Sequence, residues 1–182
     1  MSRITTPTVE QSPVASQPWL DAVNKKFGIV PNLMRVLGNS PAALGGFLSL
    51  NGELAKGTLG AKNGARIALA ISEYNSCEYC LSAHTYLGRN LAKLDDAEMV
   101  ANRDGRSSDP KAEAAVEFAV KVARQRGRID DSDLQAVRRA GFTEGEVMEI
   151  VAHVALTVLT NYVNLVAQTE IDFPAVEMRK AA

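Results

Sequence analysis

The chain is poor in cysteine and histidine, with two residues of each among 182. Two cysteines cannot build the disulfide framework that small secreted domains use. Aromatic residues are also scarce, at 5%, and 20 basic against 21 acidic side chains leave a net charge of −1. Nucleic acids and anionic membranes favour strongly basic surfaces, so we expect neither as a partner.

Long apolar runs are nearly absent too. The N-terminal stretch "MSRITTPTVEQSPVASQP" has none, so we expect no secretory signal there and predict a cytoplasmic protein. Residues 147–167 are long enough to span a bilayer, yet they include Glu149, His153 and Asn161. Such polar groups are costly in lipid. We therefore predict that this segment is a buried helix of a soluble protein.

Helix starts and stops recur along the chain, whereas no segment shows convincing strand alternation. Prolines stand at expected helix starts and glycines at expected ends, and capping boxes are expected at 95–98 and 143–146. The pattern predicts an all-α bundle of about eight helices. We place it at residues 18–175, between an N-terminal arm at 1–17 and a C-terminal tail at 176–182.

The stretch "SEYNSCEYCLSAH" holds both cysteines and one of the two histidines. Glu73, Cys77, Cys80 and His84 follow one another at spacings of 4, 3 and 4 residues. On one continuous helix, at about 100° per residue, all four would lie within about 60° of arc. Either on such a helix or across a break in it, the four side chains are expected to lie close together.

We favour a break in the helix at this point. Asn75 is a good N-cap and Glu78 stands three residues on, as in a capping box. The two cysteines would then occupy the first turn of the second helix. Free backbone N–H groups and the positive end of the helix dipole would stabilise a thiolate there.

These residue types fit thiol chemistry. An isolated thiol has a pKa near 8.5, and the thiolate is the nucleophile. His84 stands one turn beyond Cys80 and can take its proton, while Glu73 can orient the imidazole or relay the proton. After attack on a peroxide, one cysteine becomes a sulfenic acid and the other condenses with it to a disulfide. Spacing leaves the attacker open, because Cys80 is nearer to His84 but Cys77 is nearer to the helix start.

The pattern Glu-x-x-x-Cys-x-x-Cys-x-x-x-His, here "EYNSCEYCLSAH", resembles the core motif of the alkylhydroperoxidase D-like (AhpD-like) branch of the carboxymuconolactone decarboxylase superfamily. "GARIALAIS" resembles its preceding helix, and "FGIVPNLMRVLGNSPAAL" resembles the peroxidase-related subgroup. The resemblance implies an all-helical fold that assembles as a homo-oligomer (dimer, trimer or hexamer). It implies a thiol-dependent peroxidase or disulfide oxidoreductase that uses no bound cofactor and takes electrons from an external dithiol.

The resemblance also implies roles for residues. Cys80 would attack the peroxide, Cys77 would resolve, and Glu73 and His84 would relay the proton. In the well-studied hydroperoxidase branch a histidine precedes the second cysteine, whereas this chain has Tyr79 there. A phenol with a pKa near 10 is a poor base at pH 7, so this part of the relay is missing or replaced.

Other interpretations of the motif stay open. The cysteines can be inert core residues. Cys77, Cys80 and His84 can be three zinc ligands, with Glu73 or His153 as the fourth, in a non-redox oligomer. The wider superfamily also suggests a lactone decarboxylase-type lyase that would not need the thiols.

A polar stripe interrupts the apolar segment near the C-terminus. At ~100° per residue its members lie within about 80° of arc: His153, Thr157, Thr160, Asn164 and Gln168, with Asn161 at the edge. The stripe either bonds to neighbouring helices or a second subunit, which we favour, or walls the thiol pocket. Arg66 shares the register of Glu73 and His84, and we expect it to be solvated rather than paired with Glu73.

Overall fold

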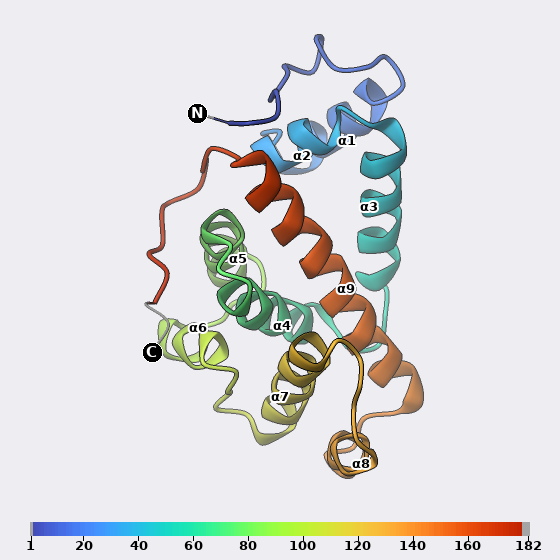
Figure 1. Ribbon diagram of the computed structural model, residues 1–182, viewed down its shortest axis with the longest axis vertical. Coiled ribbons are helices and arrows are strands. Elements are labelled where there is room, and N and C mark those ends of the chain that lie inside the picture. The colour runs from blue at the N-terminus through green and yellow to red at the C-terminus, as the bar shows by residue number, and fades with distance from the viewer. Residues whose placement is uncertain (1, 180–182) are drawn as a thin grey trace.

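The computed structural model describes residues 2–179. Over that range the chain forms nine α-helices and no strand, which confirms the all-α prediction (Figure 1). The helices are α1 (Gln17–Phe27), α2 (Asn32–Leu37), α3 (Pro41–Leu54), α4 (Ala61–Tyr74), α5 (Glu78–Asn90), α6 (Asp96–Arg103), α7 (Pro110–Gln125), α8 (Asp131–Arg139) and α9 (Glu144–Ala167). The motif region contributes two of these helices, α4 and α5, as the favoured break predicts.

Of the two capping boxes predicted from the sequence, one forms completely and the other only in part. Thr143 and Glu146 form the complete predicted capping box at the start of α9, with reciprocal bonds of 3.2 Å and 2.8 Å. At α6 only half of the predicted box forms. Asp95 accepts from the backbone N–H of Glu98 at 2.8 Å, but the Glu98 side chain turns inward to Arg66 instead.

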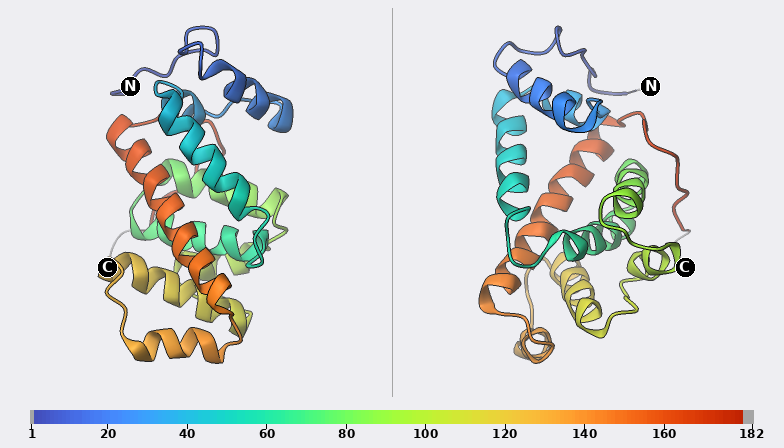
Figure 2. Two further views of the ribbon diagram at one scale, coloured as in Figure 1. Left: turned by 90° about the vertical axis from the view of Figure 1, so that its right-hand side faces the viewer. Right: turned by 180° about the vertical axis from the view of Figure 1, so that it is seen from behind.

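Two central helices hold the others together. Helix α4 packs against α5, α6, α7 and α9, and α9 packs against α2, α3, α4, α5 and α7. Figures 1 and 2 show α1–α3 at one end of the molecule and α7–α8 at the other, with α9 running between the two ends. The cysteine motif, at the α4–α5 junction, therefore lies where the two ends meet.

The core reflects this arrangement. One cluster joins α4 and α9 to α7 and α8 through residues such as Ile67, Phe118 and Ile150. A second joins α1–α3 to α5 and α9, and it contains both cysteines together with Leu44. Burial of these apolar side chains is the main term that favours folding. Both cysteines are thus part of the hydrophobic core that α5 and α9 form with α1–α3.

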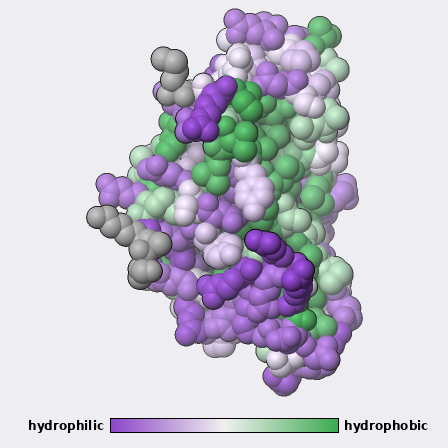
Figure 3. All heavy atoms as spheres, in the orientation of Figure 1, coloured by the Kyte–Doolittle hydropathy of each residue, from purple (hydrophilic) through white to green (hydrophobic). Residues whose placement is uncertain are grey.

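Helix α9 is long and apolar enough, by length and composition alone, to cross a membrane. It packs against five other helices of the bundle, and 44% of its most apolar 18-residue window is buried. Its outer face leaves large hydrophobic side chains exposed: Met148, Leu159, Tyr162, Leu165 and Val166. Figure 3 shows a run of hydrophobic surface on the face of the molecule that α9 crosses.

Both ends of the chain lie along the helical body. In the N-terminal arm, Arg3 N donates to Ala167 O at 2.6 Å and Pro7 O accepts from Arg35 Nε at 2.6 Å. Near the other end, Val176 N donates to Ser82 Oγ of α5 at 3.0 Å. The predicted division at residues 17 and 175 stays a prediction, and Met1 and residues 180–182 of the arm and tail lie outside the described residues.

Candidate active site

The predicted break in the motif is present, but different residues make it. Asn75 ends α4, Ser76 adopts a left-handed backbone with φ 56°, and Cys77 is the N-cap of α5. The prediction that Asn75 caps the second helix is wrong, because its Nδ2 donates to Asn161 Oδ1 of α9 at 2.8 Å. Cys77 caps the helix instead, since its Sγ accepts from Cys80 N at 3.3 Å.

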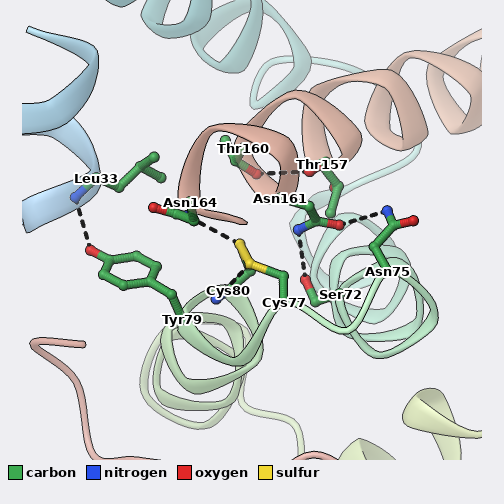
Figure 4. The surroundings of a disulfide bond; sticks show 10 residues. All are labelled: Leu33, Ser72, Asn75, Cys77, Tyr79, Cys80, Thr157, Thr160, Asn161 and Asn164. Carbon is green, nitrogen blue, oxygen red and sulfur yellow. Dashed lines mark hydrogen bonds between the residues drawn. A yellow bond between two sulfur atoms is a disulfide. The ribbon is translucent and has the colours of Figure 1, made fainter. Parts of the chain in front are cut away.

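The two cysteines form a disulfide in the core. Their Cα atoms are 5.3 Å apart, and each residue is at most 2% exposed. Cys80 lies in the first turn of α5, where unpaired N–H groups and the helix dipole favour negative charge. In Figure 4 the amide of Asn164, on α9, points at its sulfur, and Nδ2 donates to Cys80 Sγ at 3.2 Å. The Cys80 sulfur thus has a side-chain donor in addition to its place in the first turn of α5.

A cavity of about 410 Å³ opens beside the disulfide, between α5, α9 and helices α1–α3. Its walls are mainly aliphatic and aromatic, and they include Leu33, Met34, Phe47, Tyr79, Leu156 and Phe173. Within the described part of the chain, Cys80 and His84 line this cavity and Cys77 does not. A small molecule in the cavity would therefore meet the Cys80 sulfur first.

His84 follows Cys80 by one helical turn, so the two side chains lie on the same face of α5. In the disulfide-bonded protein, burial lowers the pKa of His84 to about 4, and the charge that His153 can carry contributes less. The imidazole is therefore neutral at pH 7, and burial by itself disfavours its protonation. A thiolate on Cys80 would stabilise the protonated imidazole, because opposite charges close together favour the charged forms.

The Glu73 carboxylate is held by other groups. It accepts from Arg103 Nε of α6 at 2.6 Å and from Arg179 N near the C-terminus at 2.9 Å. The Glu73 and Arg103 side chains are each 12% exposed. Among the described residues, no hydrogen bond joins Glu73 to either cysteine or to His84. The relay role of Glu73 stays a prediction; its contacts tie α4 to α6 and to the C-terminal segment.

Tyr79 forms part of the cavity wall. It is 4% exposed, and its hydroxyl oxygen accepts from Leu33 N of α2 at 3.1 Å (Figure 4). Burial raises the pKa of Tyr79 far above its ordinary value, although the Leu33 bond opposes this. The phenol is therefore no base at neutral pH, as expected from the sequence. It links α5 to α2 and shapes the cavity.

The polar stripe on α9 divides between the two predicted roles. Thr157 and Thr160 line the cavity, and their hydroxyls donate to carbonyls of their own helix. Asn164 contacts the Cys80 sulfur. Asn161 instead bonds to the α4–α5 junction. The stripe thus both walls the thiol pocket and fastens α9 to its neighbours.

His153 belongs to the packing part of this stripe. A Cβ at Gly64 of α4 would lie 2.7 Å from its Cε1, so glycine makes room for the imidazole. Burial lowers the pKa of His153, and the nearby Glu149 carboxylate opposes that shift. Glu149 is itself held by the backbone N–H of Leu59 at 2.7 Å.

Arg66 is a correction to the sequence analysis. It is neither solvated nor paired with Glu73, because its Nε donates to Glu98 Oε1 of α6 at 2.7 Å, and both side chains are under 10% exposed. Burial alone would raise the pKa of Glu98, but hydrogen bonds from Ser107, Ser108 and Asn102 outweigh it and hold the pKa well below its usual range. A charged carboxylate is thus buried with its partners.

Two residues of the site, one bonded to the Cys80 sulfur and one in the cavity wall, had no clear signal in the sequence. Asn164 belongs to the polar stripe on α9, and the helical spacing of that stripe does not predict which of its residues contacts a sulfur. Phe173 stands in an aperiodic segment after α9, where no helical pattern predicts its neighbours.

No group of three or more His, Cys, Asp or Glu side chains in residues 2–179 is placed to hold a metal ion, so the zinc alternative finds no ligand set there.

Comparison with known proteins supports the family resemblance of the motif. Residues 41–125 match the model of the carboxymuconolactone decarboxylase family. The structure is similar to an AhpD-core, uncharacterized peroxidase-related protein from Ralstonia eutropha JMP134, with 25% identity and a TM-score of 0.84 over 94% of this chain and 92% of that one. The family model and this structure both support the AhpD-like branch of the carboxymuconolactone decarboxylase family for this chain.

Other solved structures share the fold. A peroxidase-related protein from Silicibacter sp. TM1040 is 23% identical, with a TM-score of 0.80 over 93% of this chain and 91% of that one. The debrominase Bmp8, in a cysteine-to-alanine variant bound to 2,3,4-tribromopyrrole, is 18% identical, with a TM-score of 0.79 over 94% of this chain and 92% of that one. No curated protein matches this chain.

Proposed function

We propose that this AhpD-like protein is a thiol-dependent peroxidase in which Cys80 attacks the substrate and Cys77 resolves. The observation that carries the proposal is the placement of Cys80. Its sulfur is disulfide-bonded to Cys77, lines an apolar cavity, and accepts from Asn164. His84 lines the same cavity one helical turn further along.

In the reduced protein, neutral His84 takes the Cys80 proton, and the Asn164 amide and the start of α5 stabilise the thiolate. The thiolate attacks the terminal oxygen of a hydroperoxide, forming an S–O bond and breaking the O–O bond. The leaving alkoxide takes the proton from His84 and departs as an alcohol. Cys80 is then a sulfenic acid.

Cys77 completes the oxidative half of the cycle. Its thiol condenses with the Cys80 sulfenic acid, so that an S–S bond forms and water leaves. An external dithiol then reduces the disulfide with two electrons. Because Cys80 lines the cavity and Cys77 does not, the reductant's thiolate attacks Cys80, and the mixed disulfide forms there.

The test is oxidation of the reduced protein by hydrogen peroxide and by an organic hydroperoxide, with thiols counted at intervals. Wild-type protein should lose two thiols per chain and gain the Cys77–Cys80 disulfide. Cys77→Ser should stop at a sulfenic acid on Cys80, which dimedone traps, whereas Cys80→Ser should react no faster than a free thiol. Equal oxidation of both single variants, or thiols untouched by either peroxide, would reject the proposal.

A second candidate is reductive removal of halogen from an aromatic ring. The aromatic walls of the cavity favour it, since Tyr79, Tyr86 and Phe173 all line the space that Cys80 faces, and the debrominase Bmp8 has the same fold. The Cys80 thiolate would take bromine from a brominated aromatic, the ring carbon would gain a proton, and Cys77 would displace bromide to form the disulfide. Bromide release from a bromopyrrole, measured with reduced protein, distinguishes the two candidates.

We further propose that the protein is a soluble, cytoplasmic homo-oligomer. The exposed apolar side chains along α9, such as Leu159, Tyr162 and Val166, support a subunit contact there. Light scattering measures the assembly, and a stable monomer at micromolar concentration would count against it.

A lyase role independent of thiols predicts instead that Cys80→Ser keeps full activity on a lactone-type substrate.

A further inference from the structure

The segment after α9 runs along the bundle as a strap, which we define as residues 168–179. It has no regular secondary structure. Figures 1 and 2 show it leaving the end of α9, passing beside α5 and reaching α6. The strap thus lies against the helix that carries Cys80 and His84.

The strap is fixed at both ends. Near its start, Asp172 Oδ2 accepts from Asn32 N of α2 at 2.7 Å. Further along, Val176 N donates to the buried Ser82 Oγ of α5 at 3.0 Å. At its far end Glu73 accepts from Arg179 N. A segment held at three points presents its intervening side chains in defined positions.

Phe173 is the side chain that this arrangement brings to the thiol cavity. It lies between the first two anchors and lines the cavity. Its ring stands edge-on to Tyr79, with centroids 5.8 Å apart at 88°, and tilted against Tyr86 at 5.9 Å. Such arrangements stabilise aromatic pairs beyond the area that they bury. Three aromatic rings from two segments therefore form one wall of the cavity.

We propose that Phe173 is a specificity-determining residue, and that the strap selects hydroperoxides carrying an aromatic or branched apolar group. This inference rests on the proposed function of Cys80. The apolar group of such a substrate packs on the wall of Phe173, Tyr79 and Tyr86 while its peroxide oxygen meets the Cys80 sulfur. Hydrogen peroxide is too small to touch this wall and gains nothing from it.

The experiment compares two second-order rate constants on reduced protein, one for cumene hydroperoxide and one for hydrogen peroxide. Phe173→Ala should lower the ratio of cumene hydroperoxide to hydrogen peroxide about tenfold, or ~1.4 kcal/mol of transition-state binding. Phe173→Leu, which keeps an apolar wall, should recover part of this loss. Ile171→Ala is the matched control, since Ile171 packs on the same core cluster but does not line the cavity.

The outcomes separate the two proposals. An unchanged ratio in Phe173→Ala, or an equal fall in Ile171→Ala, would overturn the role of Phe173. If neither peroxide oxidises wild-type protein, the proposed function fails. Alkylation of Cys80 in the Cys77→Ser background then tests the aromatic wall by itself. Phe173→Ala should lower the rate of alkylation by N-phenylmaleimide about tenfold relative to the rate with iodoacetamide. An unchanged ratio of these two rates would reject the inference.

Discussion

The contact between Asn164 and the Cys80 sulfur makes a quantitative prediction. Asn164 is 3% exposed, and its Nδ2 donates to Cys80 Sγ at 3.2 Å. In the reduced protein this donor faces a thiolate. A hydrogen bond to a charged group contributes about 1.5–3 kcal/mol. Replacement by leucine, which has a similar shape and no donor, removes that term from the thiolate and leaves the thiol nearly unaffected.

A loss of ~1.5–3 kcal/mol corresponds to roughly a 10- to 100-fold smaller thiolate population at a fixed pH at which the thiol dominates. Because only the thiolate reacts, alkylation of Cys80 by iodoacetamide at pH 7 should slow by about the same factor in Asn164→Leu. The measurement uses the Cys77→Ser background, so that one thiol is followed. At high pH, where Cys80 is fully ionised, the two proteins should react at similar rates.

Thr160→Val is the matched control. Thr160 lines the same cavity on α9, but its hydroxyl donates to Thr157 O of its own helix rather than to a sulfur. Its alkylation rate should stay within about twofold of the parent's. The reasoning is refuted if Asn164→Leu, folded by circular dichroism, reacts at pH 7 as fast as the parent, or if Thr160→Val slows equally.

Three further predictions concern charged and titrating groups. The pKa of His84 is about 4 in the folded protein against 6.5 ordinarily. As the pH falls from 7 to 4, the unfolded chain binds the proton before the folded chain does, so the free energy of unfolding should fall by ~3 kcal/mol. In His84→Gln, the free energy of unfolding measured by denaturation should lose this pH dependence. Arg66→Leu strands the buried Glu98 carboxylate and should lower the free energy of unfolding by about 3–5 kcal/mol; a loss below ~1 kcal/mol in urea titration would contradict this. Glu73→Gln weakens the anchor of the strap and should lower the free energy of unfolding by about 1–3 kcal/mol, with faster amide exchange at Arg179. If the free energy of unfolding and the amide exchange at Arg179 both stay unchanged in Glu73→Gln while oxidation by peroxide slows, the predicted relay role explains Glu73 better than the anchor role does.

The helical framework could be read from the sequence because its signals are local. A cap such as Thr143, with Glu146 three residues on, satisfies backbone groups within one turn, so the chain itself sets where α9 begins. The spacing of Cys80 and His84 likewise fixed them on one face of a helix before any tertiary contact was known. The family motif and the disulfide partners followed from the same short stretch.

The partners of buried charges could not be read in this way. Arg66 meets Glu98 across two helices, and which carboxylate is near depends on how α6 packs on α4. Asn75 fails as a cap because Asn161, 86 residues away, offers its amide a partner. In both cases a contact with a residue distant in sequence decides where the side chain goes.

The sequence by itself determined the helices, the grouping of two sulfurs with an imidazole, and the family resemblance. Only the tertiary structure decided that Cys80 rather than Cys77 faces the cavity, that Asn164 meets its sulfur, and that the strap brings Phe173 to the wall. The physical reason is range: caps and helical spacing act within a few residues, whereas a pocket forms only where elements remote in sequence pack together.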